Sequence, residues 1–302
     1  MIAGGSGYLQ SAYILNVKFE KSNPANISRV TTTSLPNIPF EFHCGFYENC
    51  DERIIIHGNT YIHGKYPVAE LDSNAWIDNL PSTRIGRSSA AVAYHSKSKS
   101  LIVTGGWHEN MRNLLNSYEI LQIDSDGNGK KWQLYGEFPY PGRENGPLPH
   151  PVGGHTMTQF QNDLILTGGR YDLKSLNEVW KGILQENKIS FEPLPPMKQQ
   201  RAHHFAFHFE GNIFVFGGEE NDKENSSVEL YNGKNWIDGP ILPYYLSKWN
   251  GDNAVMNRNG KILIFSNENG IGIFDTENLS VNVFENQFTL RDNRSGYAAV
   301  VI

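Results

Sequence analysis

Apolar residues in this chain come in short runs of strand length that are separated by turns. Two stretches show the pattern best, with four runs each: 154–160, 163–168, 177–184 and 189–193, and then 202–209, 212–217, 226–231 and 234–237. Runs of this length predict β-strands. The second run of each stretch is continuously apolar, which indicates a strand buried on both faces. Long helical periodicity is absent, so a helical bundle or an α/β fold is disfavoured.

The second run of each unit ends in a recurring glycine doublet. Gly-Gly pairs end at positions 5, 106, 169 and 218, and degenerate copies end at 58 and 267. The spacings are therefore 53, 48, 63, 49 and 49 residues. A period near 50 with four strands per unit predicts a β-propeller, and six units account for the whole chain. Glycine at these points allows a positive φ where the chain turns outward.

The two ends of the chain read as halves of one unit. Residues 295–302 form a bare apolar run, and residues 1–4 supply the run that follows it in the other units. We therefore expect these segments to pair and to close the ring without an open edge. The fold class is all-β, a single six-bladed domain over 1–302 with four antiparallel strands per blade. The predicted blades are 295–302 with 1–34, 41–80, 87–135, 152–194, 201–238 and 251–285.

The glycine doublets, the Tyr and Trp positions of the outer strands and the Arg-x-x-x-x-Ala spacing of the inner strand resemble the kelch-repeat family over essentially the whole chain. Blades three to five match this pattern best, whereas blades two and six lack the doublet. The resemblance implies a ring with an axial channel and with partner-binding loops on one face. Tyr118, Trp132, Trp180, Tyr231, Trp236 and Trp76 are expected to wedge between blades.

Composition narrows the expected partners. A formal charge of −6 and a pI near 5.9 give no reason to expect nucleic-acid binding. No run approaches the ~20 apolar residues of a membrane helix, and no signal peptide is evident. Cys44 and Cys50 are taken as free thiols of a cytoplasmic chain, with a disulfide as the alternative. Asn-x-Ser triplets keep a secreted parent open, and the isolated chain is expected to be a monomer.

Candidate ligand-binding residues gather where the inner strands begin and where the glycine doublets end. Arg87, Arg201 and Arg294 each head an inner strand, and three arginines around one mouth favour a carboxylate-bearing ligand because the guanidinium fork binds carboxylates bidentately. The sequences around these three arginines resemble those of kelch-repeat substrate adaptors, in which such arginines bind acidic motifs. The remaining candidates are His203, His204, Arg170, Tyr171, Trp107, Tyr245 and Trp249.

Each arginine also has a structural interpretation: it can pair with a backbone carbonyl or an acid and lock the ring. His203 and His204 are adjacent, so they point to opposite faces of a strand and only one can face the channel. Metal chemistry finds no support, because no His-x-His or Cys-x-x-Cys pair occurs. The run Asp124 to Gly129 lacks the glutamate of a calcium loop, since Tyr135 stands in its place. No cofactor, metal or catalytic residue is predicted.

Three functions remain open. We favour a non-enzymatic module that binds a peptide or protein segment at the loop face, with an acidic segment as a candidate. The alternative is an enzyme such as the sialic acid mutarotases among six-bladed kelch rings, with the arginines gripping a carboxylate. The third is a scaffold with a different active surface. A closed pocket of ~300–1,000 Å³ would favour the enzyme, and an open mouth the peptide-binding module.

Overall fold

The computed structural model describes residues 2–3, 12–19, 27–35, 46–50, 53–57, 68–72, 75–77, 80–108, 113–123, 131–136, 146–243, 245–246, 253–256, 260–266, 270–284 and 298–299. These residues form only β-structure and turns, which confirms the all-β class. Among them, no helix is long and apolar enough to cross a membrane.

The described strands build six four-stranded antiparallel sheets, which we number in chain order. Sheet 1 joins β1 (Ile2–Ala3), β2 (Ala12–Phe19) and β3 (Ile27–Leu35) to β30 (Ala298–Ala299). Sheet 2 holds β4 (Phe46–Cys50), β5 (Arg53–His57), β6 (Val68–Asp72) and β7 (Ala75–Ile77). Sheet 3 holds β8 (Ala91–His95), β9 (Ser100–Thr104), β12 (Tyr118–Gln122) and β13 (Gln133–Tyr135).

The remaining three sheets repeat the same order. Sheet 4 holds β14 (Thr156–Phe160), β15 (Asp163–Thr167), β18 (Val179–Gln185) and β19 (Lys188–Leu194). Sheet 5 holds β20 (Phe205–Phe209), β21 (Asn212–Phe216), β24 (Ser227–Tyr231) and β25 (Trp236–Ile241). Sheet 6 holds β26 (Asn253–Met256), β27 (Lys261–Ser266), β28 (Gly270–Asp275) and β29 (Ser280–Phe284).

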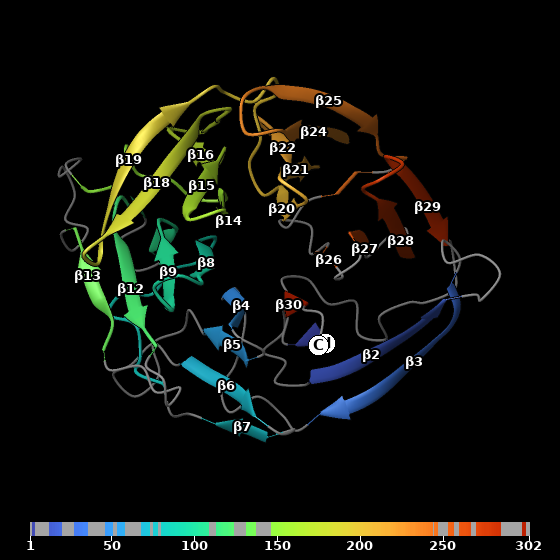
Figure 1. The fold of residues 1–302 in the computed structure, drawn as a ribbon, viewed down its shortest axis with the longest axis horizontal. Coiled ribbons are helices and arrows are strands. Elements are labelled where there is room, and N and C mark those ends of the chain that lie inside the picture. The colour runs from blue at the N-terminus through green and yellow to red at the C-terminus, as the bar shows by residue number, and fades with distance from the viewer. Residues whose placement is uncertain are drawn as a thin grey trace.

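The sheets are arranged around a centre as in a propeller (Figure 1). The strands β4, β8, β14, β20, β26 and β30 lie innermost, and β3, β7, β13, β19, β25 and β29 lie at the rim. In sheet 1, β1 lies between β2 and β30, with Ile2 opposite Ala299 and Ala3 opposite Ala298.

The apolar core lies between neighbouring sheets. One buried cluster joins Ile102 and Tyr118 of sheet 3 to Leu164 and Ile189 of sheet 4. Similar clusters join sheets 2 and 3, sheets 4 and 5, and sheets 5 and 6. All five residues of β9 are buried, since both of its faces are covered by adjacent sheets. This packing accounts for the continuously apolar second strands.

Aromatic side chains make part of these contacts between sheets. The hydroxyl of Tyr118 accepts a hydrogen bond from the backbone N–H of Ile189 at 2.9 Å, which joins the third strand of sheet 3 to the outer strand of sheet 4. Trp132 and Trp236 belong to the buried clusters between sheets 2 and 3 and between sheets 4 and 5, as expected of wedges between neighbouring sheets. Their indoles also donate to the carbonyls of Pro81 and Pro195, at 2.8 Å each. These two tryptophans therefore hold an outer strand to the segment that leads into the same sheet.

The glycine doublets turn the chain out of the second strand. Their first residues, Gly105, Gly168 and Gly217, have φ of +55°, +55° and +67°. A Cβ at any of the three would collide with a carbonyl oxygen of the segment that leads into the next sheet. Both the left-handed backbone and the close approach therefore require glycine at these points.

Candidate binding face

Three short ribbons follow the glycine doublets of sheets 3, 4 and 5. They pair β10 (Trp107–His108) with β11 (Asn113–Leu114), β16 (Arg170–Tyr171) with β17 (Lys174–Ser175), and β22 (Glu219–Glu220) with β23 (Lys223–Glu224). Each ribbon also bridges back to a residue three positions before the start of its inner strand, namely Ser88, Gly153 or Ala202. The ribbons therefore stand at the same end of their sheets, and we call this end the ribbon face.

The ribbon face carries several of the residues singled out from the sequence. Trp107 is 39% exposed and Leu173, at the turn of the second ribbon, is 83% exposed. Arg170 and Tyr171 are partly buried in the same ribbon. The face thus presents apolar side chains on hydrogen-bonded backbone, which suits the recognition of another protein.

An ion-pair network joins the second and third ribbons. Arg170 contacts Glu219 at 3.4 Å and Asp222 at 2.5 Å. Burial raises the pKa of Glu219; the charge of Arg170 opposes that shift, and Asp222 adds to it. The His203 ring lies 3.8 Å from the Glu219 carboxylate. The guanidinium of Arg170 is therefore already engaged by carboxylates of this chain.

A backbone link supports the same junction. The backbone N–H of Ser175 donates to the Asn221 side chain, and the N–H of Asn221 donates to the Ser175 hydroxyl, at 2.9 Å each. This reciprocal pair connects the two ribbons and orders their turns relative to each other.

Arg201 is buried within sheet 5, against the carboxylate of Glu229. Its side chain has 0% exposure, and its Nη1 donates to the carbonyls of Gly217 and Ser227 at 2.8 and 2.9 Å. Its Nη2 donates to the Ser227 hydroxyl at 2.6 Å and to Glu229 at 3.0 Å. Burial lowers the pKa of Arg201, and the Glu229 carboxylate opposes that shift.

Arg87 repeats this arrangement in sheet 3. Its side chain is also 0% exposed, and it donates to the carbonyls of Gly105 and Ser117 and to the carboxylate of Glu119. Both arginines thus take the locking role that the sequence left open. We call each Arg–Glu pair, with its serine, a latch.

The carboxylate of each latch also binds the segment that leads into the sheet. Glu119 accepts the backbone N–H groups of Arg84 and Ile85 at 2.8 and 3.2 Å. Glu229 accepts those of Lys198 and Gln199 at 2.6 and 3.1 Å. Each latch thus holds the segment before the inner strand against the second and third strands of the same sheet.

The other sequence candidates divide into three groups. His204 has 0% exposure and its Nε2 lies 2.9 Å from the Thr167 hydroxyl of sheet 4, so it packs between sheets. His203 is 8% exposed, beside Glu219, and Tyr245 is partly buried. Arg294 and Trp249 lie outside the described residues, as do Cys44 and the loop 124–130.

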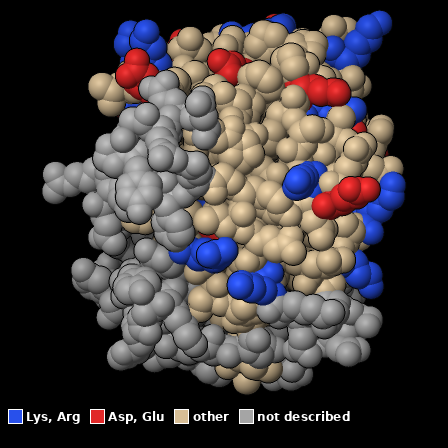
Figure 2. All heavy atoms as spheres, turned by 90° about the vertical axis from the view of Figure 1, so that its left-hand side faces the viewer, with Lys and Arg blue, Asp and Glu red and all other residues tan. Residues whose placement is uncertain are grey.

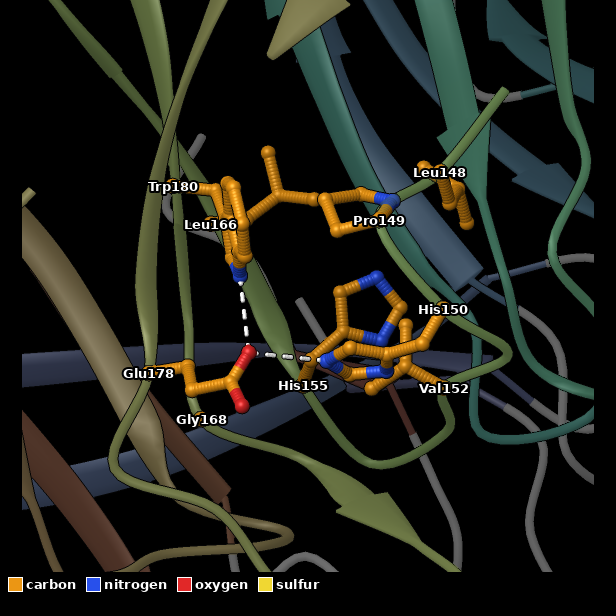
Figure 3. Close-up of a pocket in the computed structure, with 9 residues that line it drawn as sticks. All are labelled: Leu148, Pro149, His150, Val152, His155, Leu166, Gly168, Glu178 and Trp180. Atoms are coloured by element: carbon orange, nitrogen blue, oxygen red, sulfur yellow. Dashed lines mark hydrogen bonds and ion pairs between the residues drawn. The ribbon is translucent and has the colours of Figure 1, made fainter. Parts of the chain in front are cut away.

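A small recess in sheet 4 went unnoticed in the sequence. It is lined by Leu148, Pro149, His150, Val152, His155, Leu166, Gly168, Glu178 and Trp180. Figure 3 shows the Glu178 carboxylate between the indole of Trp180 and the ring of His150. The Trp180 Nε1–H donates to Glu178 Oε2 at 3.0 Å, and His150 Nε2 lies 2.9 Å from the same oxygen.

The recess is too small for a sugar. Its cavity volume of about 10 Å³ corresponds to a single ordered water, whereas small-molecule sites span ~300–1,000 Å³. The mutarotase alternative therefore gains no support from this recess. Within the described part of the chain, no group of three or more His, Cys, Asp or Glu could hold a metal ion.

Charges of both signs are interspersed on the side of the molecule that Figure 2 shows. The described ribbons themselves carry Arg170, Lys174 and Lys223 against Asp172, Glu219, Glu220, Asp222 and Glu224. These ribbons do not form a basic surface, because their acidic residues outnumber their basic ones.

The order of the strands and their arrangement around a centre define the chain as a β-propeller. Among solved structures, YjhT shares this fold with a TM-score of 0.65 at 13% identity, over 93% of this chain and 96% of that one. At this identity the likeness concerns the fold alone. No family model matches the chain.

Curated relatives point to one propeller family. Kelch repeat and BTB domain-containing protein 12 of Danio rerio is 28% identical over 222 residues, which cover 66% of this chain and 34% of that protein. Kelch-like protein 40 of Mus musculus is 29% identical over 36% of this chain and 17% of its own length, and that of Xenopus laevis is 30% identical over 33% and 16%. These kelch-repeat relatives, with the fold, support a kelch-repeat propeller family for this chain. The matched region spans about a third or less of the relatives' lengths.

Proposed function

We propose that this chain is a non-enzymatic protein-interaction module that binds a peptide or protein segment on the ribbon face. The observation that carries the proposal is the exposure of Trp107 and Leu173 on ribbons that are each bridged to the segment before an inner strand, with the ribbon of Leu173 also bonded to the third ribbon. Kelch-repeat relatives favour an interaction module in general. Rigid presentation lowers the ordering cost of binding, and apolar anchors supply much of its energy.

The described arginines give little support for an acidic partner. The expectation of an acidic partner was based on three arginines, of which Arg87 and Arg201 are buried in latches. Arg170 is paired with Glu219 and Asp222. The proposal therefore rests on the apolar anchors of the face, and selection experiments decide whether acidic segments are preferred.

We also propose that the six sheets are six blades of a closed ring. The pairing of β1 with β30, over two residue pairs, supports closure by the termini. A closed ring would hold the ribbons in fixed relative positions and so contribute to the rigidity of the face.

Selection from a displayed peptide library tests the function. Peptides that bind the wild-type chain are measured against a Trp107→Ala/Leu173→Asp variant, which removes both anchors. Leu173 has φ of +61°, a conformation that aspartate tolerates, so this substitution does not strain the turn. We expect affinity to fall at least about tenfold, as for the loss of hot-spot side chains.

A matched control changes exposed apolar residues of the rim. Ile237 and Ile241 on β25 are 48% and 76% exposed, so an Ile237→Ala/Ile241→Asp variant alters exposed apolar surface away from the ribbons. Peptides that bind both variants as tightly as the wild type would refute the ribbon face as the binding surface. The net charge of the selected peptides shows whether acidic segments are enriched.

A further inference from the structure

The sheets of this chain can be compared with one another residue by residue. Isolated bridges pair Ser88 with Trp107, Gly153 with Arg170, and Ala202 with Glu219. The residues just before these bridged positions therefore correspond. They are Arg87 in sheet 3, Val152 in sheet 4 and Arg201 in sheet 5.

The third strands can be aligned in the same way. The first glycine of each doublet donates its N–H to a carbonyl at the start of the third strand. The acceptors are Ser117 and Glu178, which directly precede β12 and β18, and Ser227, the first residue of β24. Two residues further on stand Glu119, Trp180 and Glu229. Sheet 4 thus has Val152, Glu178 and Trp180 where sheets 3 and 5 have Arg, Ser and Glu.

A fourth position also differs between sheet 4 and sheets 3 and 5. Arg84 and Lys198, three residues before the latch arginines, donate their backbone N–H groups to the latch carboxylates. The corresponding residue of sheet 4 is Pro149, which has no N–H to donate. Sheet 4 therefore has no latch: it contains neither the arginine nor the glutamate of a latch, and Pro149 has no backbone N–H that could donate to such a glutamate.

The carboxylate of sheet 4 lies in a different environment from those of the latches. The Glu178 side chain is 44% exposed, against 0% for Glu119 and 1% for Glu229. Its Oε2 is held by Trp180 and His150, and the His150 ring stacks on Tyr171 of the second ribbon, with centroids 5.1 Å apart. Glu178 is therefore a fixed, solvent-accessible carboxylate beside the ribbon face.

We propose that Glu178 and Trp180 form a recognition site for an arginine side chain of the partner, which supplies in trans the guanidinium that sheets 3 and 5 supply in cis. This inference rests on the proposed function and names one chemical feature of its partner. The planar guanidinium binds a carboxylate through two N–H groups and stacks on aromatic rings. The recess that Glu178 lines has room for about one water, which is too little for a guanidinium. The partner's guanidinium therefore lies outside the recess, on the solvent-exposed side of the Glu178 carboxylate.

Nuclear magnetic resonance with a small probe tests the site without the partner. The probe is N-acetyl-arginine methylamide, and the matched control is N-acetyl-citrulline methylamide, which has the same length without the charge. The reporter is the Trp180 indole N–H, which donates to Glu178 and is assigned with Trp180→Phe. We expect a saturable shift of this signal with the arginine probe and at least fivefold weaker binding of the citrulline probe.

Two carboxylate variants locate the response. Glu178→Gln should weaken binding of the arginine probe at least fivefold. Asp238→Asn, which removes an exposed acid from the outer strand β25, should leave it unchanged. A wild-type response that is absent, equal for citrulline, or equal in Glu178→Gln would overturn the proposal.

A grafted latch gives a second test. The variant Pro149→Lys/Val152→Arg/Glu178→Ser/Trp180→Glu places the latch residues of sheet 5 into sheet 4 and removes both residues of the proposed site, so probe binding should be lost. Because this variant lacks the Trp180 reporter, binding is followed through the backbone N–H signals of Arg170 and Tyr171, which should shift with the probe in the wild type and not in the graft. If the graft does not fold, Glu178→Gln remains decisive. The Trp107→Ala/Leu173→Asp variant should keep the probe response, so failure of the ribbon face and failure of the arginine site are distinguishable.

Discussion

The position of Arg87, Val152 and Arg201, shortly before the inner strand of sheets 3, 4 and 5, shows that the contacts of one side chain depend on the residues around it. Arg201 makes five hydrogen bonds with four groups in sheet 5, and the corresponding Val152 of sheet 4 makes none through its side chain. The sequence marks Arg87 and Arg201 as candidates for both ligand contact and locking. Burial against Glu119 and Glu229 assigns them to locking.

Residue identity alone did not settle that choice, because an arginine can turn into the sheet or out of it. The decisive information lies in the pairing of each arginine with a serine and a glutamate of the same unit. Ser117 and Glu119 in one unit, and Ser227 and Glu229 in another, both keep a two-residue spacing. Aligning the units on their glycine doublets would have revealed this set and its absence from sheet 4.

Removal of a latch arginine should destabilise the protein strongly. Arg201→Ala leaves the Glu229 carboxylate buried without its countercharge, so we expect a loss of about 3–5 kcal/mol in the free energy of unfolding. Urea denaturation of wild type and variant measures the difference.

The matched control for this prediction is Lys198→Ala. The Lys198 ammonium contacts Asp238 at 2.6 Å, but the two side chains are 44% and 73% exposed. Exposed pairs contribute ~0–1 kcal/mol, so the control should lose little. Equal losses in the two variants would contradict the locking role of Arg201.

At the scale of single elements, most long strands follow from the apolar pattern. The expected runs 163–168 and 212–217 correspond to Asp163–Thr167 and Asn212–Phe216. The run 202–209 instead begins as a strand at Phe205, because His203 has φ of +55° and Ala202 bridges to the ribbon. The ribbons were expected only as loops, since two-residue strands carry no alternating pattern.

Strand pairing in sheet 6 includes an ion pair that should give a pH-dependent contribution to stability. Lys261 of β27 contacts Asp275 of β28 at 2.6 Å. Burial alone would raise the pKa of Asp275, but hydrogen bonds from Lys261, Asn278 and the backbone of Glu277 outweigh it and lower the pKa. A lowered pKa means that the folded state holds this proton less tightly than the unfolded chain, so protonation favours unfolding.

The variant Asp275→Asn should therefore be less stable than the wild type near neutral pH, by about 1–2 kcal/mol. The advantage of the wild type should be complete above the unfolded-state pKa near 3.8 and should shrink as the pH falls through the lower pKa of the folded state. Urea denaturation at pH 7, 4 and 3 measures this difference. A difference that is constant across that range would show that the charge of Asp275 contributes nothing.

At the scale of the whole molecule, the repeat predicted a propeller and the structure has one. What the repeat could not provide is the chemical difference between units, because the propeller pattern needs only glycine doublets and buried second strands. Sheet 4 keeps both, and replaces the latch with Val152, Glu178 and Trp180. Among sheets 3 to 5, sheet 4 is the one that departs from its neighbours at these positions, and there it holds the partly exposed carboxylate of Glu178.

Closure of the ring can be tested through the register of the terminal strands. Ile2 lies opposite Ala299 in the antiparallel pair of β1 and β30. In a background of Cys44→Ser/Cys50→Ser, the variant Ile2→Cys/Ala299→Cys should form a disulfide on mild oxidation, because directly paired residues of neighbouring strands lie within the Cα separation that a disulfide spans, about 4.4–6.8 Å. Mass spectrometry of a non-reduced digest detects the linked peptides.

The oxidised variant should also unfold at a higher temperature than its reduced form, because a cross-link between the two ends constrains nearly the whole unfolded chain. The control Ile2→Cys/Ala206→Cys places one cysteine on an inner strand of sheet 5, which does not pair with sheet 1, and it should remain reduced. Efficient cross-linking of the control, or none in Ile2→Cys/Ala299→Cys, would refute closure by these strands. An open ring could still carry the individual ribbons, but it would lack the pairing of β1 with β30 that joins the N-terminal and C-terminal strands within sheet 1.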